Sequence, residues 1–154
     1  FFTAAVRVGY APEIIWKEMR DMILNRGIPN GFLKENPHGI EQLNTIPDAI
    51  QEMMLQSCEG MIRIFPVWPR AEHPNAFFRN FRAWGGLEVS AALKDGEVER
   101  VSILSHKGHP CRVENPWPGK SVKVSYEYGR PDEVHFGEYL NIELHKEEHA
   151  ELVI

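Results

Sequence analysis

Residues 87–96 read LEVSAALKDG, and this stretch decides the fold of the second half of the chain. Apolar side chains recur at every second position from Leu87 to Leu93, which indicates a strand with one buried face. Asp95 and Gly96 follow this strand, and an Asp-Gly pair between two alternating runs is a strong signal for a two-residue β-hairpin turn. The stretch therefore predicts antiparallel sheet structure.

The same alternation continues on both sides of this hairpin. Further short apolar runs, separated by turns that contain Gly or Pro, cover residues 61–65, 101–103, 111–113, 122–126 and 140–144. Short strands at near-regular spacing are typical of a sandwich of two antiparallel sheets. We therefore expect an antiparallel β-sandwich over residues 61–154.

Before residue 61 the hydrophobic period is that of a helix. Pro12 suits a first helical turn, and apolar residues at 15, 16, 19, 22 and 23 predict an amphipathic helix that ends at residues 25–27. Thr45 to Asp48 resembles a capping box, and a second apolar stripe predicts a helix that stops at Gly60. Residues 28–44 between them, with two Pro and two Gly, predict an ordered loop.

Composition narrows the classes of function. The 154 residues include 17 Lys and Arg against 22 Asp and Glu, a net charge of −5, without a basic cluster, so we expect no nucleic-acid partner. No apolar run approaches the roughly 18 residues that span a bilayer, so we expect no membrane segment. The two cysteines, Cys58 and Cys111, are too few for a disulfide framework and are expected in the core. The chain begins with Phe1, and we expect it to be a segment of a longer protein.

The predicted loop gathers polar side chains: Asn30, Glu35, Asn36, His38, Glu41, Gln42 and Asn44. A carboxylate with nearby amides is suited to water activation, because the amides can orient a water molecule while the carboxylate accepts its proton. The same residues also serve as turn formers and helix caps. Both interpretations stay open at this point.

Four blocks of sequence, in the same order, resemble glycoside hydrolase family 95, the inverting α-L-fucosidases and their relatives. Residues 30–41, NGFLKENPHGIE, resemble the family's NLFDTHPPFQID, with outright matches at Asn30, Phe32, Pro37 and Ile40. Residues 52–57, EMMLQS, resemble EMLLQS, and residues 62–66, IRIFP, resemble a strand that enters a turn with Pro. Residues 82–89, RAWGGLEV, resemble RARGGFEV.

The resemblance implies an α+β chain that contains the last helices of an (α/α)6 barrel over residues 1–60, followed by a C-terminal β-sandwich. The parent enzyme would hydrolyse an α-L-fucosyl or related bond of a glycan with inversion, without a cofactor or metal, and would be secreted or periplasmic. Glu41 falls on the position of the family's Asp, which helps two Asn residues to activate the attacking water. His38 and Asn44 would then be candidates for substrate binding.

Departures from the family pattern concern the same loop. Glu41 is one methylene longer than Asp, whereas an inverting enzyme holds its two carboxyl groups about 6.5 to 9.5 Å apart. The family's DGNFG is replaced by residues 42–45, QLNT. The general acid and the Asn pair are expected upstream of Phe1, so we expect this chain alone to be inactive.

Two other classes of function compete with hydrolysis of a glycosidic bond. Trp68, Trp84 and Trp117 would stack on sugar rings if exposed, which would make the β part a structural or carbohydrate-contacting accessory domain, but buried tryptophans in a core explain them equally. Residues 145–149, HKEEH, fit the zinc-peptidase pattern H-x-x-E-H, which needs both His on one helical face, whereas the flanking alternation predicts a charged hairpin turn. His106 and His109 are expected to be ordinary turn residues.

Overall fold

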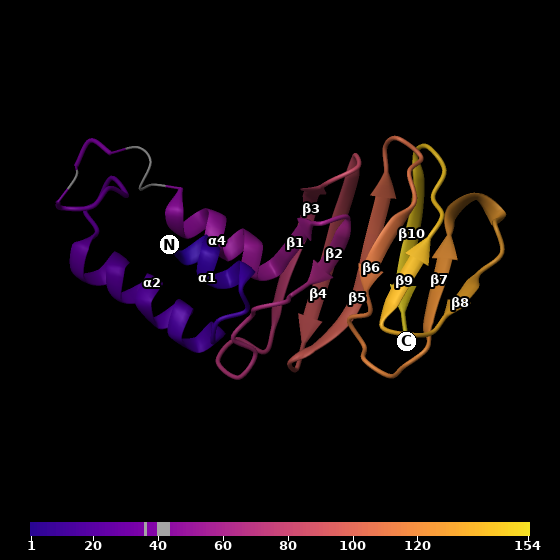
Figure 1. Ribbon diagram of the computed structural model, residues 1–154, viewed down its shortest axis with the longest axis horizontal. Helices are drawn as coiled ribbons and strands as arrows, with labels where there is room; N and C mark the ends of the chain where they lie inside the picture. Colours follow the sequence, from indigo (N-terminus) through magenta and orange to yellow (C-terminus); the bar gives the residue numbers. More distant parts are fainter. Residues whose placement is uncertain (36, 40–43) are drawn as a thin grey trace. The chain divides into compact units, whose positions relative to one another are not determined.

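The computed structural model describes residues 1–35, 37–39 and 44–154, and the chain divides into two compact units. The helical unit comprises Phe1–Met54 and Phe65–Glu72. The β unit comprises Leu55–Ile64 and His73–Ile154. The chain therefore has α+β character, with helices in one unit and strands in the other (Figure 1).

Three α-helices are found in the described part of the helical unit: α1 (Phe2–Arg7), α2 (Pro12–Arg26) and α4 (Thr45–Met54). The predicted helix over residues 12–26 is confirmed, with Pro12 in its first turn and Ile15 and Met19 buried. Helix α1 packs against both others, and Arg7 forms a bidentate ion pair with Glu52 of α4 at 2.6 and 3.2 Å. Helix α1 was not predicted from the sequence.

Residues 65–72 return the chain to the helical unit and complete its core. Phe65 and Trp68 are buried there, and their rings meet edge to face with centroids 5.8 Å apart. Trp68 also makes an edge contact with Trp16 of α2 at 5.6 Å. The backbone N–H of Phe65 donates to the carbonyl of Met54, which fixes this segment to the end of α4.

The β unit consists of two mostly antiparallel sheets, in a sandwich-like arrangement. The four-stranded sheet has the order β1-β2-β6-β9, formed by β1 (Leu55–Cys58), β2 (Met61–Ile64), β6 (Cys111–Glu114) and β9 (Tyr139–Ile142). The six-stranded sheet has the order β3-β4-β5-β10-β7-β8, formed by β3 (Ala76–Ala83), β4 (Leu87–Lys94), β5 (Glu97–Ser105), β10 (Glu148–Val153), β7 (Val122–Tyr126) and β8 (Glu133–His135). A 3-10 turn, η1 (Glu127–Gly129), follows β7.

The core of the β unit comes from the alternation that the sequence shows. On β4 the side chains of Leu87, Val89, Ala91 and Leu93 are buried, and the Asp95-Gly96 turn joins β4 to β5 as predicted. The buried side chains of β6 and β9 give the four-stranded sheet an apolar face as well. Trp117, on the connection after β6, is 1% exposed and donates its indole N–H to the carbonyl of Val98 on β5 at 2.6 Å.

Three details of the sequence prediction were wrong. Helix α4 ends at Met54 rather than Gly60, because Leu55 already pairs with Ile64 in the β1–β2 hairpin, whose turn is Glu59-Gly60. Strands β2 and β6 pair in parallel, an exception to the expected antiparallel order. Residues 145–149 do not form a hairpin turn, because they connect β9 of one sheet to β10 of the other.

Candidate functional site

The structure tests the predicted catalytic loop only in part. Glu41, the candidate base or base-orienting carboxylate, lies outside the described residues. His38 and Asn44, the candidate substrate-binding residues, are both exposed, and the Asn44 carbonyl accepts the backbone N–H of Asp48 at the start of α4. The structure therefore does not show whether these three side chains lie close together.

Other polar residues of this loop stabilise its local structure. Asn30 accepts the backbone N–H of Phe32 through its side-chain oxygen, at 3.2 Å. Glu35 accepts a hydrogen bond from Arg26 at 3.0 Å, and this bond lowers the pKa of the Glu35 carboxyl. A β-bridge between Gly27 and Leu33 closes the first turn of the loop onto the end of α2. The turn-forming interpretation thus holds for Asn30 and Glu35.

The three candidate tryptophans divide into two kinds. Trp68 and Trp117 are buried in the helical and β units respectively, so each fills a core. Trp84 is 81% exposed and lies between β3 and β4 in the β unit. Only Trp84, of the three, presents an aromatic face that a ligand can reach.

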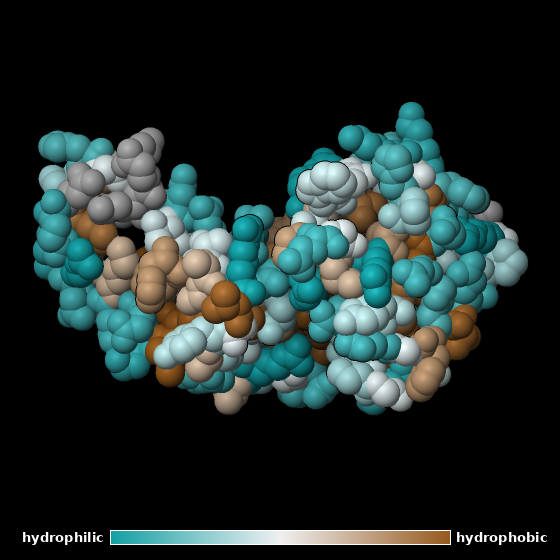
Figure 2. All heavy atoms as spheres, viewed as in Figure 1, coloured by the Kyte–Doolittle hydropathy of each residue, from teal (hydrophilic) through white to brown (hydrophobic). Residues whose placement is uncertain are grey.

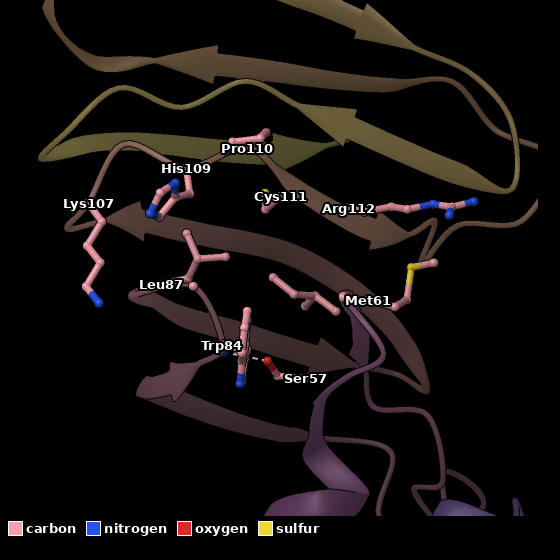
Figure 3. Close-up of a pocket in the computed structure, with 12 residues that line it drawn as sticks. Ser57, Met61, Trp84, Leu87, Lys107, His109, Pro110, Cys111 and Arg112 are labelled. Carbon is pink, nitrogen blue, oxygen red and sulfur yellow. Dashed lines mark hydrogen bonds between the residues drawn. The ribbon is translucent and has the colours of Figure 1, made fainter.

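Trp84 lines a pocket of about 690 Å³ within the β unit. This volume lies in the range of about 300 to 1,000 Å³ that is typical of small-molecule sites. The pocket is lined by residues of the β1–β2 hairpin, the β3–β4 turn and the segment that leads into β6: Ser57, Gly60, Met61, Ile62, Trp84, Gly85, Leu87, Lys107, His109, Pro110, Cys111 and Arg112 (Figure 3). We call it the Trp84 pocket.

Hydrogen bonds and packing hold the turn that carries Trp84. The Trp84 backbone N–H donates to Ser57 Oγ at 2.6 Å, which ties the turn to β1. The carbonyl of Gly86 accepts the backbone N–H of His106 at 3.0 Å, which ties it to the end of β5. Gly86 has a positive φ of 76°, and a Cβ there would lie 2.8 Å from the aliphatic stem of Lys107. The backbone under the indole is therefore fixed by its neighbours on two strands.

Among the described residues that line this pocket, three carry basic side chains and none is an Asp or a Glu. In Figure 3, Lys107 and His109 lie on one side of Trp84, and Arg112 extends at the opposite end. The Arg112 guanidinium stacks on the ring of Tyr139, 4.3 Å from its centroid. Within the described residues, none of these three side chains forms an ion pair.

The one thiol of the pocket is not poised for nucleophilic chemistry. Burial raises the pKa of Cys111 to about 12, with a smaller contribution from the negative charge of Glu143. A protonated thiol is a weak nucleophile and a poor metal ligand. The chemistry that the Trp84 pocket supports is therefore binding by an aromatic surface and basic groups, rather than covalent catalysis.

A second polar cluster lies on the six-stranded sheet. Ser102 Oγ and His149 Nε2 are 2.6 Å apart, and His149 Nδ1 is 3.8 Å from the carboxylate of Glu127. The order Ser, His, acid is that of a hydrolase triad, but 3.8 Å is beyond hydrogen-bond length. The backbone of β5 around Ser102 pairs with β4 and β10, so its N–H groups serve the sheet rather than a developing oxyanion. We interpret this cluster as a cross-strand contact.

The zinc-peptidase interpretation of residues 145–149 lacks the helix that it requires. His145 precedes a turn, and His149 lies on β10 and contacts Ser102. Glu148 is buried, and its carboxylate accepts from the His145 backbone N–H at 2.8 Å and from Arg130 at 3.1 Å. In the part of the chain that the structure describes, no group of three or more His, Cys, Asp or Glu side chains is placed to hold a metal ion.

Comparison with known proteins leaves the family open. The sequence matches no protein-family model and no curated protein. The resemblance to glycoside hydrolase family 95 therefore stays a prediction. Among the described residues, no helix is both long and apolar enough to span a membrane.

Sequence reasoning missed Lys107, His109 and Arg112, and it took His109 for an ordinary turn residue. They are distant from Trp84 in the sequence and belong to the segment that runs from β5 into β6. The available signal was the Trp84-Gly85-Gly86 turn, since two glycines beside a tryptophan indicate a tight, exposed corner. The pairing of that corner with residues 107–112 depends on the sheet topology.

Proposed function

We propose that this chain is the carboxyl-terminal part of a secreted or periplasmic glycoside hydrolase similar to family 95. The parent enzyme would hydrolyse α-L-fucosyl or related bonds of a glycan with inversion. The helical unit would supply the last helices of an (α/α)6 barrel, and the β unit the β-sandwich that follows it. By itself the chain would be inactive, because the general acid would belong to the upstream part of the parent.

The main support for this proposal is that the helical unit exposes apolar side chains at its surface. Val8 is 79% exposed, and Ile23 and Leu24 on α2 are 52% and 66% exposed. Figure 2 shows hydrophobic spheres across the surface of this unit. A soluble domain rarely leaves large apolar patches open unless another surface covers them.

This apolar surface is also hollowed, as the surface of a helix inside a larger helical domain would be. One hollow of about 600 Å³ is lined mainly by apolar residues of α1 and the start of α2, among them Phe2, Val8 and Ile14. Another, of about 190 Å³, lies between α2 and α4 and includes Ile23 and Leu24. Ridges of neighbouring helices pack into such grooves. We assign these hollows to the remaining barrel helices of the parent catalytic domain.

Glu41 is the proposed base, or the carboxylate that orients the base. It lies in the connection between α2 and α4, whose first turn is fixed by the Gly27–Leu33 bridge and the Arg26–Glu35 ion pair. A carboxylate that takes a proton from the attacking water is required for inversion. His38 and Asn44 flank it in the sequence and are proposed to contact the substrate.

The test is turnover of the parent enzyme on aryl glycosides, α-L-fucoside included, with Glu41→Gln beside the wild type. Loss of a general base lowers kcat about 10²- to 10⁴-fold. Glu35→Gln is the matched control, since the same change in the same loop removes only an exposed ion pair with Arg26. A Glu41→Gln enzyme that melts normally and keeps full turnover would contradict the assigned role.

A second candidate function is a carbohydrate-contacting accessory domain without catalytic residues. The exposure of Trp84 beside a pocket of ligand size favours it. The two proposals are compatible, because accessory contact by the β unit and hydrolysis by the parent barrel use different residues.

A further inference from the structure

We propose that the Trp84 pocket binds an anionic sugar, one that carries a carboxylate or a sulfate ester. The indole of Trp84 would stack on the sugar ring, and Lys107 with His109 would hold the negative group. This site lies on residues separate from Glu41 and does not depend on the hydrolase proposal, but it rests on the accessory-domain proposal, to which it adds the class of sugar.

The exposure of Trp84 is the first argument. Large apolar side chains at the surface lower the solubility of a protein, yet the Trp84 indole is 81% exposed on a turn that is fixed to β1 and β5. A fixed aromatic ring loses little conformational entropy when a flat ligand stacks on it. The apolar face of a sugar ring suits such a platform, because the indole offers an apolar body next to water.

The charge of the lining is the second argument. The whole chain carries a net charge of −5, but the described residues that line this pocket include Lys107, His109 and Arg112 and no Asp or Glu. None of the three forms an ion pair within the described residues. A local excess of unpaired positive charge on an acidic protein attracts an anion. A neutral sugar would leave these groups without a counter-charge.

The position of the charges is the third argument. Lys107 packs its aliphatic stem over Gly86, two residues after Trp84, and Lys107 and Trp84 line the same pocket. His109 lines the same side in Figure 3. An anionic substituent of a sugar stacked on the indole would therefore have basic groups of the same pocket on that side.

The experiment is calorimetric titration of the whole chain with three probes of equal length. These are trigalacturonic acid, its fully methyl-esterified form, and a sulfated trisaccharide. The ester presents the same ring without the charge. We expect at least one anionic probe to bind at least tenfold more tightly than the ester, about 1.4 kcal/mol, because a hydrogen bond to a charged acceptor is stronger than one to a neutral ester.

Two variants test the aromatic ring and the basic group of the site one at a time. Trp84→Ala should abolish binding of the anionic probe, and Lys107→Met should weaken it about tenfold while it keeps the aliphatic stem over Gly86. The matched controls are Phe136→Ala, another largely exposed aromatic residue in the β unit, and Lys120→Met, an exposed lysine outside the pocket. Both controls should bind as the wild type does.

Each outcome decides the inference. Preference for an anionic probe that is lost in Trp84→Ala and reduced in Lys107→Met supports it. Equal binding of acid and ester overturns the assignment of an anion, and binding of none of the probes overturns the site altogether. None of these results bears on Glu41, whose test uses turnover of the parent enzyme.

Discussion

Trp117 and Trp84 carry the same side chain in opposite surroundings. Trp117 is 1% exposed and bonds to the Val98 carbonyl, whereas Trp84 is 81% exposed on a turn. Both tryptophans lie beside Pro or Gly in the sequence, so the sequence did not predict which of them is buried. What separates them is the tertiary structure, which places Trp117 against Val98 at the start of β5 and leaves Trp84 of the β3–β4 turn at the surface.

Trp117→Phe replaces the buried indole with a smaller aromatic ring and removes its hydrogen bond to Val98. We expect the free energy of unfolding to fall by about 2 kcal/mol, from lost packing and an unpaired carbonyl. Chemical denaturation measures this change. Trp84→Phe is the control and should change stability by less than about 0.5 kcal/mol, because its side chain is exposed. Equal losses of unfolding free energy in Trp117→Phe and Trp84→Phe would contradict the burial of Trp117 and the exposure of Trp84.

Glu133 illustrates a charged network at the residue scale. Its carboxylate accepts hydrogen bonds from Tyr126 and Arg130, at 2.9 and 2.8 Å, and pairs with His135 at 3.0 Å. Burial raises the pKa of Glu133, but these hydrogen bonds together outweigh it, and the pKa is lowered. A lowered folded-state pKa stabilises the fold above the unfolded-state pKa, and this stability is lost as the pH falls through the folded value.

We therefore expect the wild-type chain to lose stability as the pH falls below about 4.3, the ordinary pKa of Glu. Glu133→Gln cannot lose a charge, so its unfolding midpoint should depend less steeply on pH in that window. Denaturation at pH 3 to 7 gives the two slopes. Glu97→Gln, at an exposed carboxyl without an ion pair in the described residues, should keep the wild-type slope. A Glu133→Gln slope equal to that of the wild type would refute the role of the network.

At the scale of elements, helices and strands with an unbroken hydrophobic period were predicted correctly, whereas strands with an interrupted period were missed. The β4–β5 hairpin and α2 were predicted because alternation, turn residues and capping signals agree there. Strand β3 was missed because its register shifts between Phe78 and Phe81, around Asn80 with a φ of 57°. The one extra residue interrupts the period of two, so the sequence shows no clean alternation.

The end of α4 was misplaced for a related reason. Glu59 and Gly60 both have positive φ, at 55° and 71°, as do Asp95 and Gly96, at 50° and 80°. The two pairs make the same kind of hairpin turn, but Glu-Gly is a weaker signal than Asp-Gly. Gly60 was therefore interpreted as a helix stop, although Leu55 had already entered a strand. The anchor positions of the candidate loop at residues 26–35 could not be predicted either, because they depend on a β-bridge and an ion pair.

Gly108 tests the connection that leads into β6. A Cβ at Gly108 would lie 2.7 Å from the backbone nitrogen of Lys146, which a side-chain rotation cannot relieve. Gly119 has nearly the same φ, 76° against 74°, but open space around it. We expect Gly119→Ala to lower the unfolding free energy by about 1 kcal/mol from its backbone alone, and Gly108→Ala to lower it by roughly 2 kcal/mol more. Equal effects in thermal or urea unfolding would contradict the close approach.

At the scale of the whole molecule, each unit has a buried core, and the helical unit also leaves large apolar side chains exposed on and beside its helices, among them Val8, Ile23 and Leu24. The sequence showed the amphipathic stripe of α2 but not which part of it would stay uncovered. Which part of α2 stays uncovered depends on α1, which packs against both α2 and α4 and was not predicted.

Ile23→Lys with Leu24→Lys tests whether upstream helices cover this surface. In the chain alone, the pair should reduce self-association and the binding of a hydrophobic dye, because two exposed apolar residues are removed. In the parent enzyme the same pair should lower the melting temperature, because charges would be buried without partners. Val134→Lys with Phe136→Lys in the β unit is the control. If the parent tolerates the pair at Ile23 and Leu24 as well as the control, the surface is not covered by its barrel.

The central claim, that the chain belongs to an inverting glycoside hydrolase, is tested most directly by the anomer that the parent enzyme releases first. Proton NMR during hydrolysis of an α-L-fucoside distinguishes the two anomers before they equilibrate. We expect β-L-fucose as the first product, and no release of it by the Glu41→Gln enzyme. Initial release of α-L-fucose, or no hydrolysis of any glycoside by the intact parent, would contradict it.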